Sequence, residues 1–165
     1  MEPVTHFLTG ACIGRAGFNR TTAYATLVTT LAAEFPDIDI VFDLGGPLVS
    51  FQHHRGFTHT LAGVPFNAAI VLAAVYGWHR WRAARGRTTI LPTRWGLLYI
   101  YGVIAGLSHL LLDFTNNYGL RPFAPFNWRW YSWDIVFIIE PFMLAVLLLG
   151  LLMPAVFSLV GQEVA

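Results

Sequence analysis

Five apolar segments, separated by short polar breaks, dominate the hydrophobic pattern of this chain. They cover residues 4–17, 22–35 with a continuation at 38–44, 61–78, 95–112 and 135–160. A spanning helix needs about 20 apolar residues to cross about 30 Å of hydrocarbon, a length that only the last three segments reach or nearly reach. No strand-like alternation of useful length occurs, so the pattern predicts an all-α fold. We expect one domain, residues 1–165, forming a polytopic integral membrane bundle of about five helices, some short or re-entrant.

Composition supports a membrane protein. Hydrophobic residues make up 56% of the chain and charged residues 12%, against about 25% charged in average soluble proteins; mean hydropathy is +0.57. The net charge of +1 gives no reason to expect a nucleic-acid partner. The single cysteine, Cys12, excludes an internal disulfide and a multi-cysteine zinc cluster. The first residues lack the basic stretch of a secretory signal peptide, so we expect His6 to be retained.

Arginines indicate the orientation. All ten positively charged residues are arginines, and half of them crowd residues 80–94, between the third and fourth segments. The positive-inside rule places this linker in the cytoplasm. Every candidate polar residue then falls at the outer ends of the helices. We therefore expect an inner (plasma) membrane protein with a polar metal pocket near the extracytoplasmic face; the reversed orientation keeps the same residues together in the cytoplasm.

Histidines and aspartates at the ends of apolar segments are the candidate chemistry, because ionisable groups in a membrane are costly and usually functional. His109 and Asp113 are four residues apart and share one helix face, as a chelating pair does; a pair that only pins helices together is the alternative. Asp37 and Asp39 follow a helix, where two anions oppose the helix dipole and suggest a bound cation. In an extended segment both would face one side; a solvated helix end is the alternative.

Residues 53–60, HHRGFTHT, are the richest polar stretch. Gly56 permits a sharp turn, which would let His54 and His59 approach one metal ion. The residues alone do not decide between His53 and His54. The planar guanidinium of Arg55 suits phosphate or carboxylate. A basic loop that touches lipid headgroups is the alternative interpretation.

Taken in order, these motifs resemble the YdjM-like family of inner-membrane, metal-dependent hydrolases. The matching pieces are His6, Pro36 to Asp39, His54 to His59, His109 to Asp113, Thr115 to Gly119, Pro122 with Phe123, and Asp134. The family has a serine after the second histidine of the arginine-glycine element, where this chain has Thr60. The family is similar, more distantly, to zinc-dependent phospholipase C. The resemblance implies hydrolysis of a phosphoester at a site of two or three divalent ions, with zinc as the expected metal.

We therefore expect a metal-dependent hydrolase that cleaves a phosphoester of a lipid or lipid-linked substrate entering from the bilayer. Arg55 would neutralise transition-state charge and Asp37 would take a proton from a metal-activated water. The expected metal ligands are His6, Asp39, His54, His59, His109, Asp113 and Asp134. No oligomeric state is predicted.

Two other function classes stay open. A metal or proton transporter would spread ionisable groups through the depth of the membrane. A non-catalytic membrane protein would enclose a structural metal with four protein ligands. A shared metal site of any class requires His59 to lie close to His109 and Asp113.

Overall fold

The computed structural model describes residues 1–49 and 54–159. Its elements are α1 (Pro3–Arg15), η1 (Phe18–Arg20), α2 (Ala25–Glu34), η2 (Phe35–Gly45), η3 (Phe57–His59), α4 (Gly63–Ala83), α5 (Trp95–Thr115) and α6 (Pro141–Leu159), where η denotes a 3₁₀ helix. Over these residues the fold is all-helical, as predicted, apart from two isolated β-bridges that involve the segment between α5 and α6.

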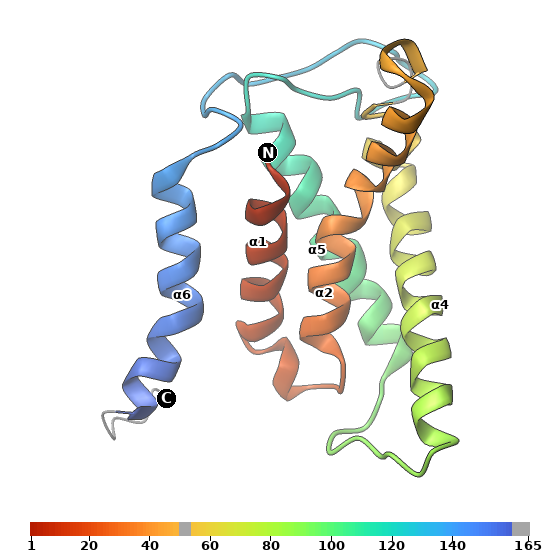
Figure 1. Ribbon diagram of the computed structural model, residues 1–165, viewed down its shortest axis with the longest axis vertical. Helices are drawn as coiled ribbons and strands as arrows, with labels where there is room; N and C mark the ends of the chain where they lie inside the picture. The colour runs from red at the N-terminus through yellow and green to blue at the C-terminus, as the bar shows by residue number, and fades with distance from the viewer. Residues whose placement is uncertain (50–53, 160–165) are drawn as a thin grey trace.

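Four helices form the bundle and the last one lies beside it. α1, α2, α4 and α5 pack together, and α6 lies next to α1 at the edge (Figure 1). The apolar core lies between α2, α4 and α5, where Val28, Val75 and Leu98 are buried. Over its described length α6 has no buried residue. A helix that is apolar on every side yet unburied suits a lipid environment better than water.

Two of the described helices are long and apolar enough to cross a membrane, α5 with 21 residues and α6 with 19. α4 also has 21 residues, but Asn67, His79 and Arg80 make it more polar than the other two. The predicted start of the last helix at residue 135 is wrong, because α6 begins at Pro141. Proline is favoured in the first turn of a helix and disfavours helical backbone in the residue before it.

The contact between α1 and α2 is unusually close because α1 carries glycines on the contacting face. A Cβ atom on Gly10 would lie 2.6 Å from the carbonyl oxygen of Thr29, and one on Gly14 would lie 2.5 Å from Cα of Thr26. Small residues four apart allow two helix backbones to approach in this way. His6 precedes Gly10 by four residues and therefore shares this face.

The candidate polar residues gather at one end of the bundle. The first turn of α1, the end of α2 with η2, the start of α4 and the end of α5 all lie there, together with the segment 116–140 (Figure 1). The arginine-rich loop between α4 and α5 lies at the opposite end (Figure 1). This arrangement agrees with the expected placement of the polar groups on a single side.

Candidate metal centre

A group of four side chains lies where η2, η3 and α5 meet. Asp37, His59, His109 and Asp113 each offer one ligand-type atom, and these atoms lie within 4.8 Å of one another. His59, His109 and Asp113 are fully buried, and Asp37 is partly buried. The proximity of His59 to His109 and Asp113, which a shared metal site requires, is therefore present.

Three separations between these atoms match those around one tetrahedral ion. Nε2 of His109 lies 3.5 Å from Oδ2 of Asp113 and 3.6 Å from Oδ1 of Asp37. Nε2 of His59 lies 3.6 Å from Oδ2 of Asp113. Ligand atoms at about 2.0–2.2 Å from a tetrahedral zinc ion are separated by about 3.3–3.6 Å. The four side chains could therefore coordinate a divalent ion with little movement.

The hydrogen bond of His109 directs a nitrogen lone pair into this space. Its Nδ1 lies 2.7 Å from the carbonyl oxygen of Ala33. Because a carbonyl only accepts, a neutral His109 carries its proton on Nδ1, which leaves a lone pair on Nε2. That lone pair faces the carboxylates of Asp37 and Asp113. Electron-rich atoms at this distance repel one another unless a cation lies between them.

His59 leads to the same conclusion. Its Nδ1 lies 3.3 Å from Oδ2 of Asp39, and its Nε2 lies 3.1 Å from Oδ1 of Asp37. A neutral imidazole has one proton for these two carboxylates. A cation at Nε2 would satisfy the second contact, while Asp39 accepts the proton on Nδ1. Metal-bound histidines commonly donate their other N–H to a carboxylate in this way.

Several buried polar atoms of the centre have no hydrogen-bond partner among the described residues. They are Nδ1 and Nε2 of His6, Oδ2 of Asp37, Nε2 of His109 and Oδ2 of Asp113. Buried polar atoms are normally hydrogen-bonded, so a cluster of exceptions needs an explanation. A bound cation supplies one.

Asp37 and Asp39 do not share a face, which differs from the expectation of an extended segment. They lie in η2, a 3₁₀ helix with three residues per turn, so side chains two positions apart point in different directions. Asp37 points toward the other three members of the group, whereas Asp39 contacts Nδ1 of His59 from the other side. The structure therefore places Asp37 among the ligand atoms and Asp39 behind one of them.

Electrostatics couple Asp39 to His59. Burial alone raises the pKa of the Asp39 carboxyl, but hydrogen bonds with His54, His59 and the backbone of Arg55 outweigh it and lower that pKa below its ordinary value. Burial lowers the pKa of His59, while Asp37 and Asp39 raise it, and the net shift is upward. The carboxylates thus make the imidazole more basic, which strengthens a nitrogen ligand.

Arg55 is built into the centre. It is 5% exposed; its Nη2 donates to Oδ1 of Asp113 at 3.0 Å and its Nη1 donates to the carbonyl of Gly119. Its backbone N–H donates to Oδ2 of Asp39 at 2.6 Å. The turn at this point uses a positive φ of 53° at Arg55 itself and not at Gly56, where the sequence suggested it. The strained backbone is held by these three contacts.

Asn116 lies in the motif Thr115 to Gly119 and is a positioning residue, a role that we did not predict for it. It is fully buried, and its Nδ2 donates to Oδ1 of Asp113 at 3.2 Å. Its Oδ1 accepts from the backbone N–H groups of Tyr118 and Gly119. An asparagine just after a helix and before Gly119 is a turn signal that would have identified it.

The remaining predicted ligands lie at different distances from the group. His6 adjoins it: its ring stacks on His109 at 3.7 Å between centroids, and its Nε2 lies 3.4 Å from Asp113 Oδ1. His54 contacts Asp39 instead, with Nδ1 3.7 Å from Oδ1. Asp134 is exposed and outside the group. His53 lies outside the described residues.

Replacing Asp39 with asparagine should weaken metal binding without abolishing it. The amide cannot provide the charge that holds the Nδ1 proton of His59, and loss of such an outer partner typically costs about 10–100-fold in metal affinity. Competition with a chelating dye measures the effect. Asp134→Asn, whose side chain is exposed and lies outside the four-residue group, should leave the affinity unchanged. Equal affinities of the two variants would contradict the role of Asp39.

Comparison with known proteins gives one family match and one similar protein. Residues 1–164 match the family described as "YdjM inner membrane protein". A Bacillus subtilis (strain 168) protein described as "Uncharacterized protein YfhP" is 28% identical over 151 residues, which are 87% of this chain and 43% of that protein. The chain thus spans less than half the length of this relative, and no solved structure matches. Because the match to the family runs through almost every residue, the chain belongs to the YdjM inner membrane protein family.

Proposed function

We propose that this protein is a metal-dependent hydrolase that cleaves a phosphoester of a lipid or lipid-linked substrate. The observation that supports this most is the convergence of two histidine nitrogens and two carboxylates on one buried space. Nitrogen and oxygen ligands of this kind suit zinc and similar divalent ions. When bound, such an ion lowers the pKa of a coordinated water and polarises a phosphoryl oxygen.

His54 suits the role of proton acceptor. Its side chain is 39% exposed, and it lines the same cavity as Asp37 and Asp39. A carboxylate that orients one nitrogen of a histidine, as Asp39 does here, leaves the other nitrogen to accept a proton. We assign this role to His54 in place of Asp37, because Asp37 lies among the ligand atoms.

Arg55 provides the positive charge for the phosphoryl group. Asp113 and the carbonyl of Gly119 hold its two terminal nitrogens, and its buried Nε has no partner among the described residues. A guanidinium fixed before the substrate arrives stabilises developing negative charge without reorganisation.

The position of the centre supports an extracytoplasmic site. The arginine-rich loop lies at the other end of the bundle (Figure 1), and arginine-rich loops are retained in the cytoplasm. Ionisable groups at one end also disfavour a transporter, which needs them along a path through the membrane.

Elemental analysis combined with an activity assay tests the proposal. The purified protein should contain about one zinc-type ion per four-ligand group and release phosphate or a phosphorylated headgroup from phospholipid vesicles, with a chelator abolishing the release. His109→Ala should lose both metal and activity. His79→Ala is the matched control, because His79 lies near the other end of α4 and contacts Tyr24. Substoichiometric metal in all three proteins would refute the site, and metal without hydrolysis would refute the enzyme.

A structural metal site is the second candidate. Four protein side chains are enough to close a tetrahedral shell, as structural zinc sites do, whereas catalytic sites keep one position open. Three of the four side chains here are fully buried. The described residues contain one such group, so the two or three ions expected from the sequence stay a prediction that metal counting tests. Stoichiometric metal that stabilises the fold but supports no hydrolysis would favour this candidate.

A further inference from the structure

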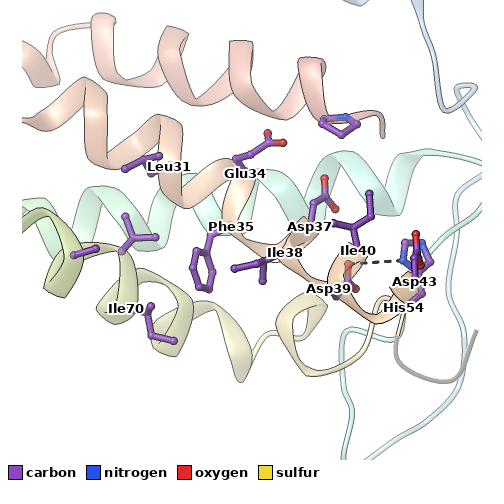
Figure 2. Close-up of a pocket in the computed structure, with 13 residues that line it drawn as sticks. Leu31, Glu34, Phe35, Asp37, Ile38, Asp39, Ile40, Asp43, His54 and Ile70 are labelled. Atoms are coloured by element: carbon purple, nitrogen blue, oxygen red, sulfur yellow. Dashed lines mark ion pairs between the residues drawn. The ribbon is translucent and has the colours of Figure 1, made fainter. Parts of the chain in front are cut away.

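A cavity of about 710 Å³ opens beside the metal centre, between η2, the end of α2 and the middle of α4. Its two ends differ in chemistry. Asp37, Asp39 and His54 line one end, and Leu31 and Ile70 line the other, as Figure 2 shows. The cavity therefore joins the polar centre to the apolar flank of the bundle.

The apolar end is open to the surroundings of the bundle. Leu31 is 41% exposed, Ile38 52% and Ile70 53%. Large apolar side chains grouped around an open cavity mark a binding surface, because a monomer in water rarely leaves such a patch uncovered. In a membrane protein the medium around this flank is lipid, so the group most available to fill the cavity is an acyl chain.

We propose that this cavity binds one acyl chain of a membrane lipid and holds the phosphate of that lipid at its polar end. The inference rests on the proposed function for the reacting end and adds the place where the tail of the lipid substrate lies. The shape supports an amphiphile over a soluble phosphoester, because a soluble ester would leave the end formed by Leu31 and Ile70 empty.

The polar end explains why the headgroup stops there. The carboxylates of Asp37 and Asp39 cannot be buried under an acyl chain without cost. They also repel a phosphate unless a cation and Arg55 offset their charge. The tail thus lies against α2 and α4, and the phosphate reaches the four-residue group. The volume lies within the range of about 300–1,000 Å³ that small-ligand pockets occupy.

Photolabelling in vesicles tests the tail position without requiring hydrolysis. The protein is reconstituted in dioleoylphosphatidylglycerol that contains a small fraction of the same lipid with a diazirine in one acyl chain. We expect labelling concentrated on α2, η2 and α4, and reduced by excess unlabelled lipid of the same kind. Label on α6, which has no buried residue along its described length, measures non-specific contact with bulk lipid.

Two neighbouring alanines of α4 provide matched variants. Ala73 and Ala74 are both exposed, but only Ala74 lines the cavity. Ala74→Trp should reduce labelling of the cavity residues about tenfold. This is the effect expected if the bulkier side chain displaces about two methylene groups of the acyl chain from the cavity. Ala73→Trp should leave it unchanged, and thermal unfolding confirms that both variants are folded.

The outcomes separate this inference from the proposed function. If Ala74→Trp reduces labelling of the cavity residues, the acyl-chain site is supported. If the protein in the same experiment releases no phosphate, the hydrolase is refuted. The acyl-chain site is overturned if the cavity residues are labelled equally in the two variants. It is also overturned if they are labelled no more strongly than α6. The acyl-chain site is also overturned if Ala74→Trp releases phosphate from lipid as fast as the unmodified protein does.

Discussion

Replacing Asp113 with asparagine should remove the metal from the purified protein. Oδ2 of Asp113 lies 3.5 Å from His109 Nε2 and 3.6 Å from His59 Nε2, so the variant loses the charged ligand between the two histidines. We expect a loss in affinity larger than the about 10–100-fold that removal of an outer partner causes. Elemental analysis of folded, detergent-solubilised protein measures it.

The same variant should also be less stable. Arg55 is buried against Asp113, and removing one partner of a buried ion pair typically costs about 3–5 kcal/mol. Asp37→Asn separates the two effects, because Asp37 belongs to the ligand group but has no arginine contact in the described structure. Asp134→Asn is the matched control for the substitution and should keep full metal content. Retention of stoichiometric metal by Asp113→Asn would refute the proposed coordination.

Gly10→Ala should destabilise the protein, whereas Gly77→Ala should not. A Cβ on Gly10 would meet Thr29 O at 2.6 Å and Thr30 Cα at 2.7 Å, which are backbone atoms that cannot move independently of α2. Overpacking of this kind typically costs about 1–3 kcal/mol. Gly77 lies inside α4 with nothing within 4 Å of the added atom, so the better helix propensity of alanine should stabilise that helix by up to about 1 kcal/mol.

The unfolding temperatures of the two glycine variants should therefore move in opposite directions. Metal affinity should fall in Gly10→Ala as well, because His6 lies one helical turn away and its ring stacks on His109. Equal shifts in unfolding temperature would show that the α1–α2 contact relaxes more easily than its geometry indicates.

Much of the fold follows from apolar runs and their breaks. The helices at α1 and α5 lie where the hydrophobic pattern predicts them, and the sharing of one face by His109 and Asp113 follows from α-helical periodicity alone. The start of α6 was missed because residues 135–139 are apolar, yet their backbone pairs with the end of α5: the N–H groups of Ile135 and Val136 donate to the carbonyl of Thr115. Hydropathy does not distinguish a helix from an apolar loop that covers one.

The roles of Asp37 and Asp39 depend on the local helix type, which composition does not reveal. An extended segment would place both on one face, whereas the 3₁₀ geometry of η2 turns them apart. The carbonyl of Ala33 acts through a contact with His109, which lies 76 residues further along the chain. Such contacts have no local pattern, so only the assembled bundle reveals them.

The four ligand-type residues come from three elements and span positions 37 to 113. An unfolded chain holds them far apart and has no preformed site, so a metal ion stabilises only the folded state. At a free concentration a hundredfold above the dissociation constant, this linkage adds about 2.7 kcal/mol to folding. The supply of metal would then set the rate at which membrane proteases degrade the protein, independently of any reaction that the protein catalyses.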